Sequence, residues 1–547
     1  MTFKLPHASL VLCALALPGG LAWAADAPDP ALTVPAKERA AETARLRALG
    51  LRVPDAGVVL ERPWDQPFTA QSFVVPQIWL KPPSGDSAVA ADALAADLPL
   101  LERLMALAYG GWDSAAARGW NWSKWFADWR AQLGAHAGKS LPLADAFAPM
   151  KALMTFQLDN HTGLPLGIYF GSSSATYVLS GSAKGACTEI RTAAGLRFPL
   201  DPKDPAQHVR VAKRWNLAAG KLDAVNYLAV PGSRGDVISV VCGGASIPLT
   251  AATPGRIDLD APRASFAARK EPILALGKAT KDEPDLKLLA PDVAYARFPT
   301  FHKINTQLIE QRLPTWPRPT GKESVLIVDL RDNQGGDAAV EALDKWLTPA
   351  DMQRMAVAKE SGRHVGASCA YEALRWGYSM ISSYEVKPPL GEELTRELQS
   401  GIDALLKPSQ AGCPRTFRDS KGSWGYAQHR LIQPGPVAGQ RRILVLVNNG
   451  TGSDGEYMAL LLASLPQTVL AGSNTFGVAQ FIQPGFSVLP HTRLPFQIAL
   501  GMSDIYGDHR SFDGYGLDVD VLFATPADQA PENIIALARY LGTGKAR

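Results

Sequence analysis

Two continuous apolar runs, each followed directly by a glycine-containing turn, place the strongest constraint on the fold of this chain. One is SVLIVDL at residues 324–330, which leads into RDNQGG, and the other is RILVLVN at residues 442–448, which leads into NGTGSDG. Apolar runs of this length without alternation are typical of strands that are buried on both faces. Such strands need helices on both sides of their sheet.

Helical patterns follow both runs. We expect helices after Asp337 and after Ser453, and two more buried strands that begin at Val293 and Thr468. Repeated alternation of buried strands with helices predicts an α/β domain, which we expect at residues 291–547.

A helical domain is predicted before it. Residues 25–150 begin with a Pro- and Ala-rich arm and continue into helical patterns that carry a group of aromatic side chains. These are Trp120, Trp122, Trp125, Phe126 and Trp129. Because the last members recur at helical spacing, we interpret the group as core and not as a sugar-binding platform.

Residues 151–290 form a predicted β-rich middle region. Strand patterns begin at Gly167, Ala175 and Asp236. A degraded peptide-binding module stays an open alternative for this region, since no convincing signature of one is present.

The first residues have the pattern of an export signal. A lysine precedes an apolar run at residues 8–17, and small residues with the spacing AWA follow at residues 22–24. This predicts a signal peptide at residues 1–24, cleaved after Ala24, and a periplasmic or secreted protein. The apolar run is well short of the roughly 20 residues of a membrane-spanning helix, so we expect no integral membrane segment after cleavage.

Charge argues against one class of partner. The chain has 547 residues, with 55 basic and 52 acidic side chains and a net charge of +3. The basic residues are spread along the chain without a run that would follow a phosphate backbone. We therefore expect no nucleic acid partner.

Five cysteines are present, and Cys13 lies in the predicted signal peptide, so four remain after cleavage. An even number of cysteines in an oxidising compartment favours disulfides. We predict the pairs Cys187 with Cys242 and Cys369 with Cys413, because each closes a loop within one region. Four free buried thiols are the alternative, and the spacing matches no zinc site.

Ser453 lies where the second apolar run passes into a helix. The helix dipole and the unpaired N–H groups at such a turn stabilise negative charge that develops beside a nucleophile. The same serine also has a purely structural interpretation. Ser453 and Glu456 have the Ser-x-x-Glu spacing of a helix capping box, which requires no catalysis.

Three further motifs accompany this serine. DLRDNQGGD from Asp329 follows a buried strand, and its paired glycines can present backbone N–H groups to an oxyanion. Downstream lie AGSNTFG from Ala471 and DGYGLDVDV from Asp513. A glycine turn after a strand is common by itself, whereas this ordered set of four segments is not.

With these segments in this order, the chain resembles the tail-specific (C-terminal processing) and tricorn-type serine peptidases over residues 291–541. A weaker similarity is present near His161. The resemblance implies a crotonase-like (ClpP-like) catalytic domain. It also implies that Ser453 is the nucleophile and that the N–H groups of Gly336 and Asp454 form the oxyanion hole.

The resemblance also indicates the type of base. Many processing peptidases use a lysine after Thr-Phe-Gly, but Val478 occupies that position here. Tricorn-type members use a histidine with an acidic partner, and Asp513 stands where Glu is usual. His161, in LDNHTGL, resembles the Asp-x-His segment of the chlamydial branch, so we assign it as the base, with His302 and His509 as alternatives.

We therefore predict a serine-type peptidase that acts on peptides or unfolded proteins, with no cofactor or metal. A non-catalytic protein that keeps the peptidase fold and binds a ligand or peptide is the alternative, because the lysine is missing and Asp513 is one methylene shorter than Glu. An esterase of the α/β-hydrolase type is disfavoured, since Thr451 replaces the first glycine of its nucleophile motif.

Overall fold

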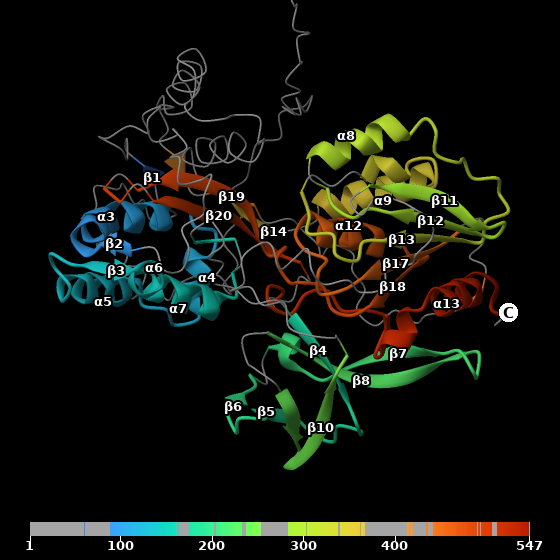
Figure 1. The fold of residues 1–547 in the computed structure, drawn as a ribbon, viewed down its shortest axis with the longest axis horizontal. Helices are drawn as coiled ribbons and strands as arrows, with labels where there is room; N and C mark the ends of the chain where they lie inside the picture. Colours follow the sequence, from blue (N-terminus) through green and yellow to red (C-terminus); the bar gives the residue numbers. More distant parts are fainter. Residues whose placement is uncertain are drawn as a thin grey trace, which may run out of the picture.

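The computed structural model contains a helical unit and a large sheet with covering helices, and a smaller sheet lies between them (Figure 1). It describes residues 59–60, 88–159, 161–163, 174–201, 204–231, 237–252, 283–301, 303–336, 340–360, 363–366, 413–414, 416–418, 434–435, 441–489, 491–492, 494–505 and 511–545. The predicted signal peptide and the strand expected from Gly167 lie outside these residues.

Helices between residues 91 and 157 form the helical unit. They are α3 (Ala91–Ala108), α4 (Trp112–Ala117), α5 (Trp122–Gly134), α6 (Leu143–Ala146) and α7 (Ala148–Gln157). Strands β2 (Ala88–Ala90) and β3 (Ser140–Pro142) pair antiparallel at its edge.

Helix α5 shows why this unit folds. The side chain of Asn121 caps its N-terminus and accepts a hydrogen bond from the Lys124 N–H at 3.0 Å. Its buried face consists of Trp122, Trp125, Phe126, Trp129 and Leu133, and Trp120 packs partly buried against the same core. The indole N–H of Trp129 donates to the Ala146 carbonyl at 2.8 Å, so this ring is buried with its polar group satisfied. The interpretation of the aromatic group as core is confirmed.

A hairpin from the C-terminal half completes this core. Strands β19 (Phe481–Val488) and β20 (Pro495–Asp504) pair antiparallel, and their buried side chains belong to the same apolar cluster as those of α3 and α5. β20 also pairs with β14 (Arg363–Gly366), which pairs with β16 (Thr416–Arg418). Strands β1 (Val59–Leu60) and β15 (Cys413–Pro414) form a separate pair.

The largest sheet of the described residues has 13 strands, and its parallel part contains both apolar runs. The parallel strands are, in order, β12 (Val293–Arg297), β13 (Val325–Asp329), β17 (Arg442–Val447), β18 (Thr468–Gly472) and β21 (Val521–Leu522). β11 (Asp285–Ala290) pairs antiparallel at the edge. The four predicted buried strands and a mixed α/β fold are confirmed.

Helices cover both faces of these strands (Figure 1). On one face lie α8 (Lys303–Arg312), α9 (Pro349–Glu360) and α12 (Asp454–Ala463), and α13 (Pro531–Thr543) lies on the other. Side chains of β13 alternate between the two cores: Leu326 packs on the α12 side and Ile327 on the α13 side. Burial on both faces explains the continuous apolar run.

The helix expected after Asp337 needs correction. In the described residues a 3-10 helix spans Val340–Leu343, and α9 begins only at Pro349. Thr348 and Asp351 fix this start, because the Thr348 hydroxyl accepts from the Asp351 N–H at 3.1 Å and the Asp351 carboxylate accepts from the Thr348 N–H at 3.0 Å. Proline at the first helical position favours the same start.

The β-rich middle region extends the large sheet beyond β21. Its strands, in order, are β7 (Arg210–Asn216), β8 (Lys221–Pro231), β4 (Ser174–Leu179), β10 (Ala245–Ala251), β9 (Val237–Cys242), β5 (Cys187–Thr192) and β6 (Arg197–Pro199). The junction is one pair, Val521 with Lys213. The strands predicted from Ala175 and Asp236 are confirmed.

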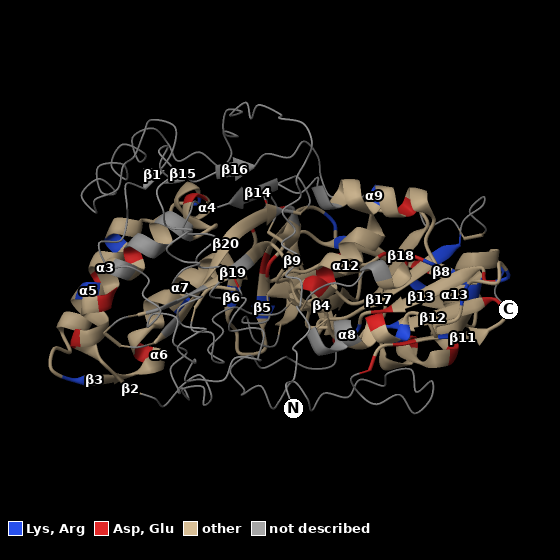
Figure 2. Ribbon diagram, turned by 90° about the horizontal axis from the view of Figure 1, so that it is seen from above, with Lys and Arg blue, Asp and Glu red and all other residues tan. Residues whose placement is uncertain are grey.

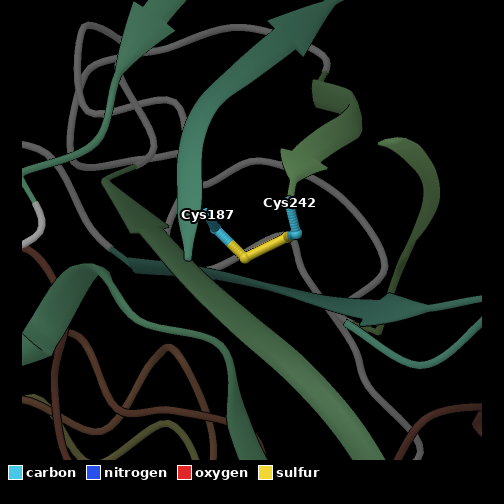
Figure 3. Close-up of a disulfide and its surroundings, with 2 residues drawn as sticks. All are labelled: Cys187 and Cys242. Carbon is cyan, nitrogen blue, oxygen red and sulfur yellow. A yellow bond between two sulfur atoms is a disulfide. The ribbon is translucent and has the colours of Figure 1, made fainter. Parts of the chain in front are cut away.

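The predicted disulfide between Cys187 and Cys242 is also confirmed (Figure 3). The two residues are register partners on the antiparallel strands β5 and β9, so the bond joins adjacent strands. The side chains of Cys369 and Cys413 lie outside the described part of the chain, and that pair stays a prediction.

Short 3-10 helices at Pro205–Gln207 and Pro526–Gln529 complete the elements. Among the described helices, none combines the length and the apolar character needed to cross a membrane. Both acidic and basic residues lie along α5 (Figure 2).

Candidate active site

The loops that follow β13, β17 and β18 meet at the carboxyl ends of these strands. The Thr451 hydroxyl donates to the Leu330 carbonyl at 2.8 Å, and the Gly452 N–H donates to the Asn333 carbonyl at 2.8 Å. From the third loop, the Phe476 N–H donates to the Thr451 carbonyl at 2.8 Å. In α/β folds, binding sites lie at this edge of the sheet. Three of the four sequence motifs therefore converge there.

A buried ion pair holds the first of these loops. Arg331 donates from Nε to Asp329 Oδ1 at 2.9 Å and from Nη2 to Oδ2 at 2.7 Å, and the Tyr295 hydroxyl adds a bond to Oδ2 at 2.9 Å. Burial alone would raise the pKa of Asp329, but the charge and hydrogen bonds of Arg331 lower it below its ordinary value. The carboxylate stays ionised, and the bidentate pair fixes the start of the loop.

Ser453 occupies a strained position at the N-terminus of α12. Its φ is 50° and its ψ is −123°, a combination that residues with a side chain rarely adopt. Its side chain makes no capping hydrogen bond to the helix, so the serine does not form its half of a capping box. A strained serine on a strand-to-helix turn is the arrangement of a nucleophile elbow.

Glu456 connects this helix to the third loop, a role that the sequence reasoning missed. Its buried carboxylate accepts hydrogen bonds from the Gly477 N–H at 2.7 Å, the Val478 N–H at 2.9 Å and the Thr475 hydroxyl. Burial raises the pKa of Glu456 to about 7, although these hydrogen bonds favour the ionised form. Glu456 thus fixes residues 475–478 beside the serine turn.

Val478 packs against the turn itself. It is buried, and its Cγ1 lies 3.1 Å from the position that a Cβ on Gly452 would take. The residue at the lysine position of the processing peptidases therefore lies beside the neighbour of Ser453. A valine side chain cannot exchange a proton, so Val478 cannot act as a base.

A glycine turn lies against Ser453 from the other loop. A Cβ on Gly335 would stand 2.6 Å from Ser453 Cβ and 2.8 Å from the Asp454 nitrogen. Gly335 and Gly336 have φ values of 96° and 127°, in the region that favours glycine. The Gly335 N–H donates to Asn333 Oδ1 at 2.8 Å, which orients the turn. The two segments expected to supply the oxyanion hole, at Gly336 and Asp454, are thus brought together.

Asp513 is fully buried at the start of the fourth motif. Its Oδ1 accepts from the Gln480 N–H at 2.7 Å and its Oδ2 from the Phe481 N–H at 3.3 Å. In return, Gln480 Oε1 accepts from the Asp513 N–H at 3.3 Å. Burial raises the pKa of Asp513 well above its ordinary value, and the negative charges of Asp159 and Glu456 raise it further.

His161 lies in the loop after α7 and is half-buried. Its N–H donates to Asp159 Oδ1 at 2.7 Å, and its carbonyl accepts from Gln497 Nε2 at 2.5 Å, which holds the loop on β20. One polar side-chain atom from each of His161, Asp513 and Asp159 lies within 4.8 Å of the other two. The structure therefore brings together the histidine and the acid that the sequence analysis selected. The alternatives His302 and His509 lie outside the described residues.

Asp159 is the member of this cluster that the sequence reasoning did not assign. It is fully buried, and burial raises its pKa to about 6. The available signal was the Asp-x-His spacing, which lets a carboxylate accept the N–H two residues later. These three residue types also bind metal ions. One oxygen of Asp159 and both oxygens of Asp513 accept hydrogen bonds from backbone N–H groups. These bonds fix the carboxylates, and fixed carboxylates can orient an imidazole.

A parallel sheet with covering helices, whose strands end in a strained serine turn backed by a glycine turn, places this chain among mixed α/β proteins. Residues 292–521 match the family model of Peptidase family S41. The matched segment is therefore similar to that family. It contains Ser453 and Asp513, whereas His161 precedes it.

Several solved structures resemble the chain at low identity. Mature CPAF complexed with lactacystin is 12% identical, with 82% of this chain and 97% of that chain covered and a TM-score of 0.35. The photosystem II D1 C-terminal processing protease is 15% identical, with 83% and 98% covered and a TM-score of 0.32. The tricorn protease is 12% identical, with 82% and 37% covered and a TM-score of 0.34.

These similarities are too distant to bear on activity, so the family assignment depends on the matched segment. A search of curated protein sequences gives no significant match.

Proposed function

We propose that this protein is a serine-type peptidase that forms an acyl-enzyme on Ser453. The observation that carries the proposal is the strained serine turn at Ser453, whose side chain does not cap the helix and which lies against Gly335, inside the segment that matches the model of Peptidase family S41. In this proposal His161 is the base, Asp513 orients it, and the N–H groups of Gly336 and Asp454 form the oxyanion hole.

The chemistry follows from these roles. The Ser453 oxygen attacks the carbonyl carbon of a peptide bond while His161 takes the hydroxyl proton, and the oxyanion is stabilised by the two N–H groups. The C–N bond then breaks as His161 returns the proton to the amine. His161 then takes a proton from water, whose oxygen attacks the acyl carbon, and the bond to the Ser453 oxygen breaks as His161 returns the proton to that oxygen. Asp513 stabilises the imidazolium without itself exchanging the proton.

The finer fold and the location belong to the same proposal. The catalytic domain is of the crotonase-like (ClpP-like) type, and the protein is exported to the periplasm or secreted. The disulfide between Cys187 and Cys242 supports export, because disulfides persist in oxidising compartments. The proposed substrates are peptides or unfolded proteins.

Hydrolysis of a soluble, permanently unfolded protein and of short fluorogenic peptides tests the proposal. The wild-type protein should release new amino termini, and Ser453→Ala should release none above the uncatalysed rate. An exposed-site substitution, Ser182→Ala, serves as the matched control and should leave the rate unchanged. Equal rates in wild type and Ser453→Ala would contradict the proposal.

The alternative is a non-catalytic protein that keeps this fold and binds a ligand or peptide. Val478 in the lysine position and the short acid Asp513 favour this alternative. A fluorophosphonate distinguishes the two functions, since it reacts with an activated serine and not with an inert one. No phosphonylation of the wild-type protein would favour the binding function.

A further inference from the structure

The imidazole of His161 has a second carboxyl group beside it. Asp159 and Asp513 come from different parts of the fold, the loop after α7 and the fourth motif, and each has a carboxylate oxygen within 4.8 Å of one nitrogen of the ring. Both are fully buried. A histidine base is usually oriented by one carboxylate, so the second carboxyl group needs an explanation.

The local turn does not explain why residue 159 is ionisable. Asp159 Oδ1 accepts the His161 N–H at 2.7 Å, and asparagine makes the same turn with its neutral side chain. Burial of an ionisable group is costly unless a partner compensates it. A partner that becomes positively charged during the reaction, as His161 does in the proposed mechanism, provides that compensation.

Other charged and titratable groups face this pair. Tyr109 lies beside Asp159, and burial together with the Asp159 charge raises the pKa of Tyr109. The positive charge of Arg118, at the end of α4, acts on Tyr109 in the opposite direction. Glu456 adds negative charge near Asp513. Acidic groups therefore predominate around His161, and a protonated imidazole is the charge that such surroundings stabilise.

We propose that Asp159 is a second positioning residue for His161, so that two carboxyl groups hold the ring and stabilise its protonated form. This inference depends on the proposed function. Asp159 acts through the histidine and contacts no reacting atom.

A double-substitution cycle tests the shared role. The probe is a fluorophosphonate, and the measured quantity is the rate of phosphonylation of Ser453. We expect Asp159→Asn and Asp513→Asn each to lower the rate about tenfold to hundredfold, and the double variant to fall to the background of Ser453→Ala. A double variant no slower than Asp513→Asn would overturn the inference.

The pH profile separates positioning from folding. Removal of an anion beside an imidazole lowers the stability of the imidazolium, so the acid limb of the labelling rate should move to lower pH by about one unit in Asp159→Asn. Asp97→Asn is the matched control, because Asp97 is also fully buried and contacts a histidine, with Oδ1 at 2.8 Å from His491 Nδ1. This control should lose stability and keep the wild-type pH profile.

A variant at Tyr109 keeps the inference testable if Asp159→Asn does not fold. The Tyr109 hydroxyl hydrogen-bonds to Asp159 and favours its ionised form, so Tyr109→Phe should move the acid limb in the same direction by a smaller amount. An unmoved limb in every folded variant, with wild-type Ser453 still labelled, would overturn the role of Asp159 and leave the proposed function standing. No labelling of the wild type would instead contradict the proposed function.

Discussion

Gly335 and Ser453 approach so closely that a methyl group on the glycine would stand 2.6 Å from the serine Cβ. Carbon atoms cannot remain at that separation without a shift of one backbone. The contact therefore fixes the serine turn relative to the loop that ends in Gly336. It makes Gly335 a sensitive point for the geometry of the proposed oxyanion hole.

We predict that Gly335→Ala lowers peptidase activity about a hundredfold or more, because the added methyl group displaces either Ser453 or the Asp454 nitrogen. Gly321→Ala is the control. Gly321 has a φ of 83° and no atom within 4 Å of an added Cβ, so its substitution has the backbone strain without the clash. Initial rates on an unfolded protein should fall in the first variant only. Comparable activity in the two variants would show that the contact does not position the site.

The strain at Ser453 predicts a difference in stability between two inactive variants. Glycine adopts a φ of 50° and a ψ of −123° without the side-chain penalty, whereas alanine does not. Ser453→Gly should therefore be more stable than Ser453→Ala by about 1 kcal/mol, and both should be inactive. Urea unfolding gives the difference. If the alanine variant is at least as stable, the backbone at this position is not strained.

Glu456 should make the free energy of unfolding depend on pH. Because the pKa of Glu456 is about 7 in the folded protein against an ordinary 4.5, the folded state binds more protons than the unfolded state between these values. The free energy of unfolding should then fall as pH rises from about 4.5 to 7, and Asp159 adds to the same trend up to about pH 6.

Glu456→Gln removes this titration, so its free energy of unfolding should change less between pH 5 and pH 7.5, as followed by chemical denaturation. Glu310→Gln, at an exposed position of α8, should keep the wild-type slope. A wild-type protein that gains stability over this range would contradict the assignment.

Val478→Lys tests whether the site can be converted to a lysine base. We predict no gain in activity, since an ammonium beside a histidine disfavours the imidazolium that must form. Val478 is also buried against the serine turn, so a charge there should lower the unfolding temperature. Val478→Met, which stays apolar, is the control for size. Faster hydrolysis by the lysine variant would show that this site operates with a lysine base.

Much of the catalytic region was predictable because its signals are local. Strands β13 and β17 are buried on both faces, so their apolar runs identified them directly. The turn at Ser453 was predictable because β17 and α12, which it joins, follow one another closely in the sequence. The disulfide between Cys187 and Cys242 followed from loop closure within one region.

The remaining features depend on contacts between distant segments. The packing of β19 and β20 on the helical core has no local pattern, since a strand's own sequence does not identify its partner. The start of α9 depends on a single capping pair, Thr348 with Asp351. No local pattern assigns a role to Asp159, because its burial beside Asp513 exists only after folding.

The central claim is that Ser453 is a nucleophile activated by His161, and peptide mapping of the fluorophosphonate adduct tests it most directly. Wild-type protein at neutral pH should carry one adduct on Ser453, and its rate of formation should fall as pH drops through the ordinary imidazole pKa near 6.5. The His161→Ala protein, shown to be folded by its circular dichroism, should form the adduct at less than about a hundredth of that rate. An adduct on another residue, or labelling of Ser453 in His161→Ala at the wild-type rate, would contradict the account.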